Sequence, residues 1–195
     1  MADLTYERVL ELFAESDRRF EQRMEKLAES RSESDKRIEK INSELTKKIG
    51  ELGDTLGRFA EEQVRADIIN KFGQWGIPVH AITNHYSQKD DNNDTIYEVD
   101  ILIYNSQYAI AIEVKNTLRP EHVDGHIQRM AKIQQHPMVG LQGKTLLAGV
   151  AGMIIANGAD KYAENKGIFV LKPSGDTIQI ANNKNSFKPK EWEVK

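Results

Sequence analysis

The chain has 195 residues, of which 39% are hydrophobic and none is cysteine, and its formal net charge is −3 at pH 7. The lack of cysteine excludes disulfides, thiolate metal sites and a cysteine nucleophile. The slightly negative charge argues against a general phosphate-binding surface, although carboxylates gathered around a metal ion would give the same sum. The N-terminus has no basic start followed by an apolar run, and no stretch reaches about 18 apolar residues. We therefore expect a cytoplasmic protein without a signal peptide or a membrane span.

Residues 1–55 are expected to form a coiled-coil helix that joins copies of the chain. Apolar residues recur there in alternating steps of four and three: Tyr6, Leu10, Phe13, Phe20, Met24, Leu27, Ile38, Ile41, Leu45 and Leu52. Four polar residues fill the remaining positions of this seam: Asp17, Arg31, Ser34 and Lys48. A single helix with so narrow an apolar stripe is marginal in water, so the stripe predicts a partner helix. Two alternatives stay open, a helical hairpin folding back near residues 30–34 and a solvated arm.

Residues 56–195 are expected to form a mixed α/β domain. Before it, Gly50, Gly53 and Gly57 interrupt the seam and predict a joint or a close helix contact. An amphipathic helix is expected over residues 56–72. The further elements, in chain order, are a strand at 79–85, a polar loop at 87–94, a hairpin at 97–116, a helix at 119–137, a strand at 145–156, a helix at 157–167 and a hairpin at 168–182 that turns at 173–176. This order predicts a mixed sheet flanked by helices.

The hairpin "YEVDILIYNSQYAIAIEVKN" carries four ionisable residues among apolar ones. With a loop at residues 105–108, Asp100 lies opposite Glu113, and Glu98 lies opposite Lys115. Side chains alternate along a strand, so these four are expected to share one face with Leu102, Tyr104, Ala109 and Ala111. The other face is expected to be uncharged core: Tyr97, Val99, Ile101, Ile103, Ile110, Ile112 and Val114.

Two carboxylates directly opposite each other on paired strands repel, because their Cβ atoms are only about 5 Å apart. Burial strengthens the repulsion and raises one pKa unless a cation is present. Lys115 can neutralise one charge, and a divalent ion between Asp100 and Glu113 would balance the rest. Ligation by oxygen alone suits Mg²⁺ or Mn²⁺. The simpler alternative is a solvated strand face with an ion pair between Glu98 and Lys115.

These residues resemble the core of the PD-(D/E)XK nuclease superfamily, in which a metal-binding Asp and a Glu-x-Lys motif lie on adjacent strands. Asp100 takes the place of the Asp, Glu113 that of the second acid and Lys115 that of the lysine. The segment "GRFAEEQV" resembles the upstream helix that often adds an acid, a role that falls to Glu61, with Glu62 as the alternative. Residues 50–185 are similar to a prokaryotic group of that superfamily with an N-terminal coiled coil, through "LGRFAEE", "YEVDIL", "EVKNTL" and "AENKGIFVL". "EVD" stands where the superfamily's name places a proline, which leaves subfamily and substrate open.

The resemblance implies a restriction-endonuclease-like fold and phosphodiester hydrolysis that depends on Mg²⁺ or Mn²⁺. It implies that Asp100 and Glu113 ligate the ion together with the main-chain carbonyl of Val114, and that Glu61 acts through water. Lys115 would position the attacking water or offset the negative charge that develops during the reaction.

Two groups of residues are expected to support this site. Glu98 could orient Lys115. The helix at 119–137 places His122, His126 and Arg129 at helical spacing, and these side chains form either a phosphate-contacting face or a plain solvated face.

We therefore expect a metal-dependent endonuclease that acts on DNA and assembles as a homo-oligomer through its N-terminal helix. The residues leave open whether the substrate is DNA or RNA and whether cleavage is internal or terminal. A nuclease fold that binds nucleic acid or protein without cutting is one alternative. A scaffold in which the coiled coil is the functional part is the other.

Overall fold

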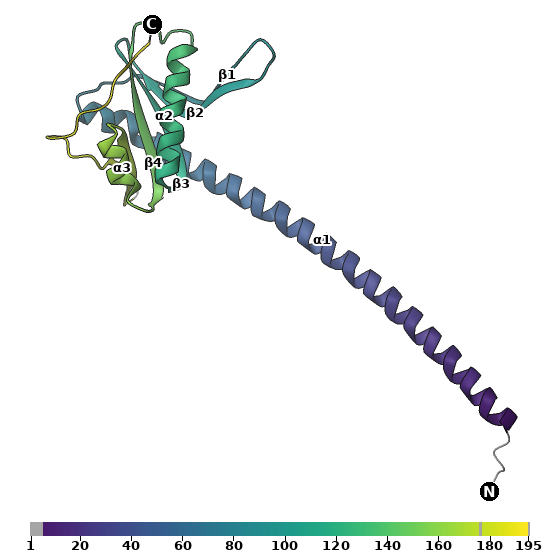
Figure 1. Cartoon of the computed structure of the whole chain (residues 1–195). Helices are drawn as coiled ribbons and strands as arrows, with labels where there is room; N and C mark the ends of the chain where they lie inside the picture. Colours follow the sequence, from purple (N-terminus) through teal and green to yellow (C-terminus); the bar gives the residue numbers. More distant parts are fainter. Residues whose placement is uncertain (1–5, 176, 195) are drawn as a thin grey trace. The chain divides into compact units, whose positions relative to one another are not determined.

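The computed structural model describes residues 6–175 and 177–194, and the chain divides into two compact units, Met1–Gly53 and Asp54–Lys195 (Figure 1). Helix α1 (Tyr6–Gln74) supplies the described part of the first unit and the opening of the second. The expected long helix is present, and because residues 30–34 are helical, the helical-hairpin alternative is wrong. Within the described residues, no helix combines the length and the apolar character that crossing a membrane requires.

The three glycines near the unit boundary do not interrupt α1. The helix continues through Gly50, Gly53 and Gly57, so the expected joint is wrong. A Cβ atom added at any of the three would meet nothing within 4 Å in the described structure, so none of them allows a close contact within this part of the chain. A glycine costs a helix only about 1 kcal/mol relative to alanine, which is too little to end one whose other residues favour it.

In the described part of the chain, the second unit is built on a seven-stranded sheet. Its strands are β1 (Ala81–Lys89), β2 (Thr95–Tyr104), β3 (Tyr108–Leu118), β4 (Thr145–Ile155), β5 (Phe169–Ser174), β6 (Thr177–Ile180) and β7 (Trp192–Glu193). β1, β2 and β3 are antiparallel neighbours, whereas β3, β4 and β5 run parallel. β6 pairs antiparallel with β5, and β7 pairs antiparallel with β4. The expected α/β class, with a mixed sheet flanked by helices and preceded by a long helix, is confirmed.

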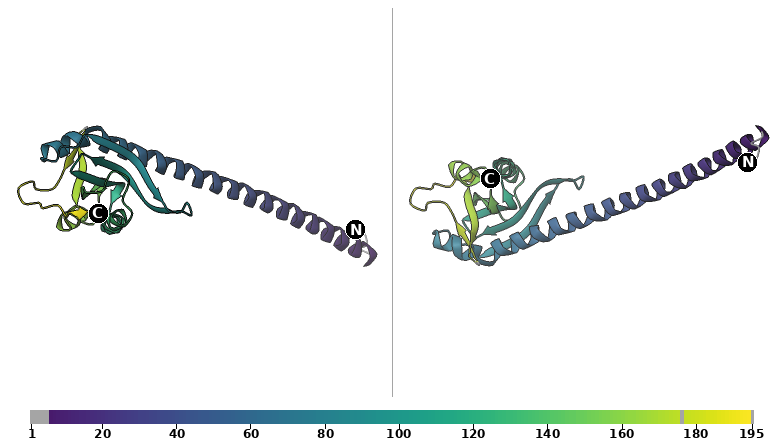
Figure 2. Two further views of the ribbon diagram at one scale, coloured as in Figure 1. Left: turned by 90° about the horizontal axis from the view of Figure 1, so that it is seen from above. Right: turned by 90° about the horizontal axis from the view of Figure 1, so that it is seen from below.

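Helices cover both faces of this sheet (Figure 2). On one face, α2 (Pro120–Gln135) and α3 (Ala159–Asn165) contribute Val123, Met130, Ile133, Ala159 and Ala163 to a buried cluster, called here the α2 cluster. On the other face, the end of α1 contributes Ala60, Val64, Ile68 and Phe72 to a second one, the α1 cluster. Because β3 and β4 are covered on both faces, they read as nearly continuous apolar runs.

The structure differs from the prediction at the expected polar loop and at one short strand. β1 continues to Lys89, so the first three residues of the expected polar loop belong to a strand. The turn that follows is closed by Asp90, whose Oδ1 accepts hydrogen bonds from the backbone N–H groups of Asn92 and Asp94, both at 2.9 Å. Strand β7 was not expected, because two residues are too short to show a periodicity.

The turn end of the β2–β3 hairpin has the expected register. Tyr104 pairs with Ala109, and the ladder continues to the pair of Ile101 with Ile112. Asn105 fixes the turn, because its Oδ1 accepts hydrogen bonds from the backbone N–H groups of the second and third residues after it, both at 2.7 Å.

The faces of β2 differ from the prediction at its other end. Tyr97 and Val99 pack in the α2 cluster, whereas Ile101 and Ile103 pack in the α1 cluster. Residues two apart on a regular strand share a face. The expected common face for Val99 and Ile101 is therefore wrong, and the alternation breaks at the residue between them, Asp100.

Candidate active site

The sheet is locally irregular around Asp100. Pairing of β2 with β1 has the same register on both sides of this residue, yet the ladder omits the pair of His85 with Asp100. His85 has a φ of 50°, in the left-handed region, which is uncommon for a residue other than glycine. On the other side, the described β2–β3 ladder ends at Ile101. Asp100 is therefore absent from the regular ladders with both neighbouring strands.

The carboxylate of Asp100 contacts β3 at this irregularity. Its Oδ2 accepts a hydrogen bond of 2.7 Å from the backbone N–H of Val114. This bond takes the place of a backbone pairing, and it holds Asp100 next to the Glu-x-Lys segment of β3.

Glu113 is buried, at 5% exposure, between two cations. Its Oε1 lies 2.6 Å from Nζ of Lys115, and its Oε2 lies 2.6 Å from Nη1 of Arg129 in α2. Burial by itself raises the pKa of Glu113, but the hydrogen bond from Lys115 and the charges of Arg129 and Lys115 outweigh it, so the pKa lies below its usual value. Glu113 is therefore held as an anion.

Asp100 is in the opposite electrostatic situation. Burial and the negative charge of Glu113 raise its pKa from 3.8 to about 6, and Glu61 adds to the effect. The hydrogen bond from Val114 and the charge of Lys115 oppose the rise without cancelling it. The ionised form of Asp100 is therefore unfavourable at this buried position beside Glu113, and a cation bound next to it would offset that cost.

Lys115 has a different partner from the predicted one. It pairs with Glu113 on its own strand, so the expected orienting role of Glu98 is wrong. Glu98 is exposed on β2 and pairs in the ladder with Ser87 of β1. The break in β2 at Asp100 explains the difference, because the β2–β3 pairing on which the prediction relied ends before Glu98.

His126 and Arg129 of α2 contact the site from the face of the sheet that α2 covers. Nε2 of His126 lies 3.0 Å from the carbonyl oxygen of Ala111, and its Nδ1 lies 3.1 Å from Nη1 of Arg129. A carbonyl can only accept, so Nε2 carries the hydrogen and Nδ1 accepts from Arg129. Burial lowers the pKa of His126 to about 4. The neutral ring thus orients Arg129, which in turn holds Glu113.

The expected common face of His122, His126 and Arg129 is therefore wrong in both of its versions. His126 is buried, at 1% exposure, and reaches neither phosphate nor solvent. Nδ1 of His122 accepts a hydrogen bond of 3.2 Å from the backbone N–H of Arg119 at the start of α2. The helical spacing of these three residues did not reveal that Arg129 turns toward the sheet.

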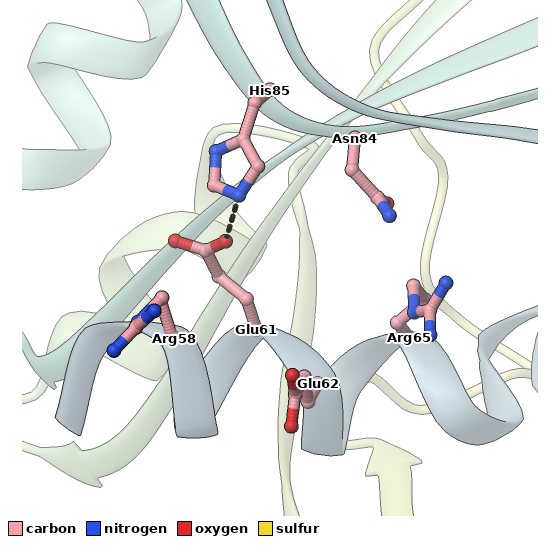
Figure 3. Close-up of a pocket in the computed structure, with 6 residues that line it drawn as sticks. All are labelled: Arg58, Glu61, Glu62, Arg65, Asn84 and His85. Carbon is pink, nitrogen blue, oxygen red and sulfur yellow. Dashed lines mark ion pairs between the residues drawn. The ribbon is translucent and has the colours of Figure 1, made fainter. Parts of the chain in front are cut away.

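Glu61, rather than Glu62, faces the sheet (Figure 3). Its Oε2 lies 2.9 Å from Nε2 of His85. The two residues line a pocket of about 230 Å³ whose other lining residues are Arg58, Glu62, Arg65 and Asn84. His85 also lines a smaller pocket of about 140 Å³ that contains Asp100. His85 therefore stands between Glu61 and Asp100, and no sequence pattern had indicated it.

The donor set fits a hard divalent cation only in part. The carboxylates of Asp100 and Glu113 and the carbonyl of Val114 are oxygen donors of the kind that Mg²⁺ and Mn²⁺ prefer. Each carboxylate oxygen of Glu113 keeps a lone pair beyond the one used by its cation. Across residues 6–175 and 177–194, however, no three His, Asp or Glu side chains gather closely enough to ligate one ion. Glu61, paired with His85, would need an intervening water.

No protein-family model matches the chain, and no curated protein matches it in sequence. Among solved structures, it is similar to the small subunit of the heterodimeric restriction endonuclease R.BspD6I, with 15% identity over 61% of this chain and 72% of that chain. The TM-score is 0.31. The superposition is loose, so the roles proposed below depend on the side chains themselves.

Proposed function

We propose that the protein is a metal-dependent nuclease that hydrolyses phosphodiester bonds of DNA in the cytoplasm, as an endonuclease. The observation that carries the proposal is the contrast between two adjacent carboxylates, Glu113 held ionised by Lys115 and Arg129, and Asp100 with a raised pKa. Mg²⁺ or Mn²⁺ held by Asp100, Glu113 and the Val114 carbonyl would stabilise charge on the phosphoryl group and acidify the attacking water.

The chain's own residues have distinct roles in this proposal. Lys115, half-exposed and anchored by Glu113, directs its ammonium group toward the attacking water or the negative charge that develops on the phosphate. Arg129 keeps the carboxylate of Glu113 in place. Glu61 acts through water, and His85 fixes its orientation.

Basic residues beside the carboxylates support nucleic acid as the ligand. Arg58 and Arg65 lie in the pocket that contains His85. On the other side, Arg129 and Lys132 line a pocket of about 280 Å³ together with Glu98, which also borders the pocket of Asp100. Arg58 and Arg65 on one flank and Lys132 on the other could contact successive phosphates despite the overall charge of −3.

Cleavage of linear, circular, single-stranded and branched DNA, with RNA for comparison, tests the proposal. With Mg²⁺ present, Lys115→Ala and Glu113→Ala are expected to lower the cleavage rate at least 100-fold, because each removes a group that acts in the transition state. Lys161→Ala and Glu191→Ala change exposed residues of the same kinds away from the site and should cut normally. Circular dichroism confirms that each variant is folded. Undiminished cleavage by the folded Lys115→Ala variant would show that the roles are misassigned.

One observation favours a second candidate, a nuclease fold that binds nucleic acid without cutting it. Both oxygens of Glu113 are already paired with cations, and the described residues do not assemble three metal-ligating side chains. In the same experiment this alternative predicts DNA binding by the unaltered protein, with no product formed in Mg²⁺ or Mn²⁺.

We also propose that the protein is a homo-oligomer joined through the seam of its first unit. The apolar seam residues from Leu10 to Leu52 are between 51% and 65% exposed, so nothing in the described chain covers them. A partner helix would bury this stripe, as in a coiled coil.

A further inference from the structure

The seam of the first unit carries information about how two copies would pair, beyond the self-association proposed above, on which this inference rests. Four polar residues interrupt the apolar positions: Asp17, Arg31, Ser34 and Lys48. All four are helical and exposed. Charged residues in a coiled-coil seam are costly unless they are paired, so their partners decide between the possible arrangements.

A parallel, in-register pair places every seam residue against its own copy. Asp17 would then face Asp17, Arg31 would face Arg31, and Lys48 would face Lys48. All three contacts bring like charges together within the seam, where water is partly excluded and the repulsion is stronger than on an open surface. The parallel arrangement therefore has three unfavourable layers in about nine turns of helix.

An antiparallel pair with its two-fold axis between Ser32 and Glu33 removes each of these conflicts. Asp17 then faces Lys48, and Arg31 faces Ser34. Every apolar seam residue from 13 to 52 meets an apolar partner in the same register: Phe13 with Leu52, Phe20 with Leu45, Met24 with Ile41, and Leu27 with Ile38. One placement of the axis thus satisfies the charged and the apolar positions together.

The residues that border the seam favour the same arrangement. Arg23 and Glu44 each directly precede a seam residue, and in the antiparallel register they lie beside each other across the two helices. In the parallel register, Arg23 would lie beside Ala28 and Glu44 beside Ile49. Charged bordering positions set partner orientation in coiled coils. The antiparallel dimer gains two such ion pairs, one on each side of the axis.

We infer that two copies of the chain associate as an antiparallel coiled coil over residues 13–52, with Asp17 of each copy paired to Lys48 of the other. At a rise of about 1.5 Å per residue, the paired segment is about 60 Å long. The C-terminal ends of the two paired segments, and with them the two copies of Gly53, lie at opposite ends of the coiled coil.

Engineered disulfides in the full-length chain test the orientation, since the protein contains no cysteine. Met24→Cys and Ile41→Cys are made separately, one of them with a mass tag, and oxidised alone and mixed. The antiparallel register predicts a disulfide between the two variants in the mixture and little in either alone. Disulfides within the separate variants would establish a parallel pair and overturn the inference while leaving self-association intact. Monomers by sedimentation would overturn both, and dimers without any disulfide would overturn this register.

Charge reversal provides a second, independent measurement on the full-length chain. Asp17→Lys places four cations around the two Lys48 layers of the antiparallel dimer, and we expect the dissociation constant measured by sedimentation to rise at least 10-fold. Adding Lys48→Asp restores opposite charges and should recover dimerisation to within about 3-fold. In a parallel dimer each change exchanges one like-charged layer for another, so the single variant would dissociate no more readily than the unaltered protein. Circular dichroism checks that α1 remains helical.

Discussion

Asp100 carries a stability cost that fits the metal-binding role proposed for it. Burial and the charge of Glu113 raise its pKa from 3.8 to about 6, so the fold prefers its protonated form. When an acidic group has a higher pKa in the folded protein than in the unfolded chain, the folded protein loses stability as the pH rises from the lower pKa to the higher one. The ionised Asp100 is therefore unfavourable at neutral pH unless a cation binds beside it.

Asp100→Asn should consequently be more stable than the unaltered protein above pH 6 in the absence of divalent metal. We expect the free energy of unfolding to rise by about 1–2 kcal/mol at pH 7.5, since one pKa unit corresponds to about 1.4 kcal/mol. The amide oxygen can still accept the hydrogen bond from Val114. At pH 4 the difference should vanish, because Asp100 is then protonated in the folded protein. Urea unfolding at the two pH values, with cleavage assays in parallel, measures both effects. Lower stability of the variant at pH 7.5 would show that Asp100 is satisfied without a cation.

In our proposal Arg129 does not contact the substrate. Its removal should nevertheless damage the site, because it holds Glu113 in place. Arg129→Met keeps the apolar stem but leaves Glu113 with one cation and Nδ1 of His126 without a donor. We expect a loss of about 2–3 kcal/mol in the free energy of unfolding at pH 7, because a buried group loses its partner. Arg129→Lys keeps the charge and should lose less. Unchanged urea unfolding of Arg129→Met would mean that Glu113 does not depend on this ion pair.

At the scale of elements, local periodicity revealed most of the fold. The register of the β2–β3 hairpin followed from its alternating apolar residues, and the order of helices and strands followed from the spacing of apolar runs and turns. The reversal of faces at Asp100 could not be predicted in this way. It accompanies a positive φ at His85, a conformation that depends on neighbouring strands and leaves no pattern in the sequence.

The candidate site, too, could be predicted from the sequence only in part. The closeness of Asp100 to the segment with Glu113 and Lys115 could be predicted from the hairpin, although the regular pairing ends at Ile101. Their partners Arg129 and His85 could not, because each comes from an element whose packing against β3 or α1 is set by the whole domain. The glycines of α1 show the converse error, since a local helix-breaking signal was overridden by the helix around it.

Glycines in two elements test whether the surrounding structure, rather than local propensity, decides the effect of a substitution. A Cβ atom at Gly57 of α1 would meet nothing within 4 Å, whereas at Gly152 of β4 it would lie 2.6 Å from Cβ of Leu118. Gly57→Ala should therefore raise the free energy of unfolding by about 0.5–1 kcal/mol and leave cleavage unchanged. Gly152→Ala should lower it by about 1–3 kcal/mol, because the parallel strands β3 and β4 must shift to admit the methyl group. A stability loss in Gly57→Ala would indicate that α1 does bend or make a contact at this residue.

At the scale of the whole molecule, the two units have separable tasks in our proposal. Both buried clusters consist of residues from Ala60 onward, so the core of the second unit is complete without the first. The candidate catalytic residues also lie within the second unit, from Glu61 to Arg129. The first unit has an exposed seam instead of a core, and in our proposal a partner helix covers this seam.

A chain that begins at Asp54 should therefore fold, sediment as a monomer and cleave DNA at a rate per site within about 3-fold of the full-length protein. Sedimentation, urea unfolding and cleavage of a short duplex measure the three properties. The matching control is the truncated chain with Glu113→Ala, which should fold but not cut. Because the inferred coiled coil separates the two copies of Gly53, supercoiled plasmid should be converted to open circles before linear product appears, both by the full-length and by the truncated protein. If the truncated chain folds as a monomer but loses cleavage, residues 1–53 contribute to the active site or bring two copies together on one substrate, and the separation of tasks is wrong.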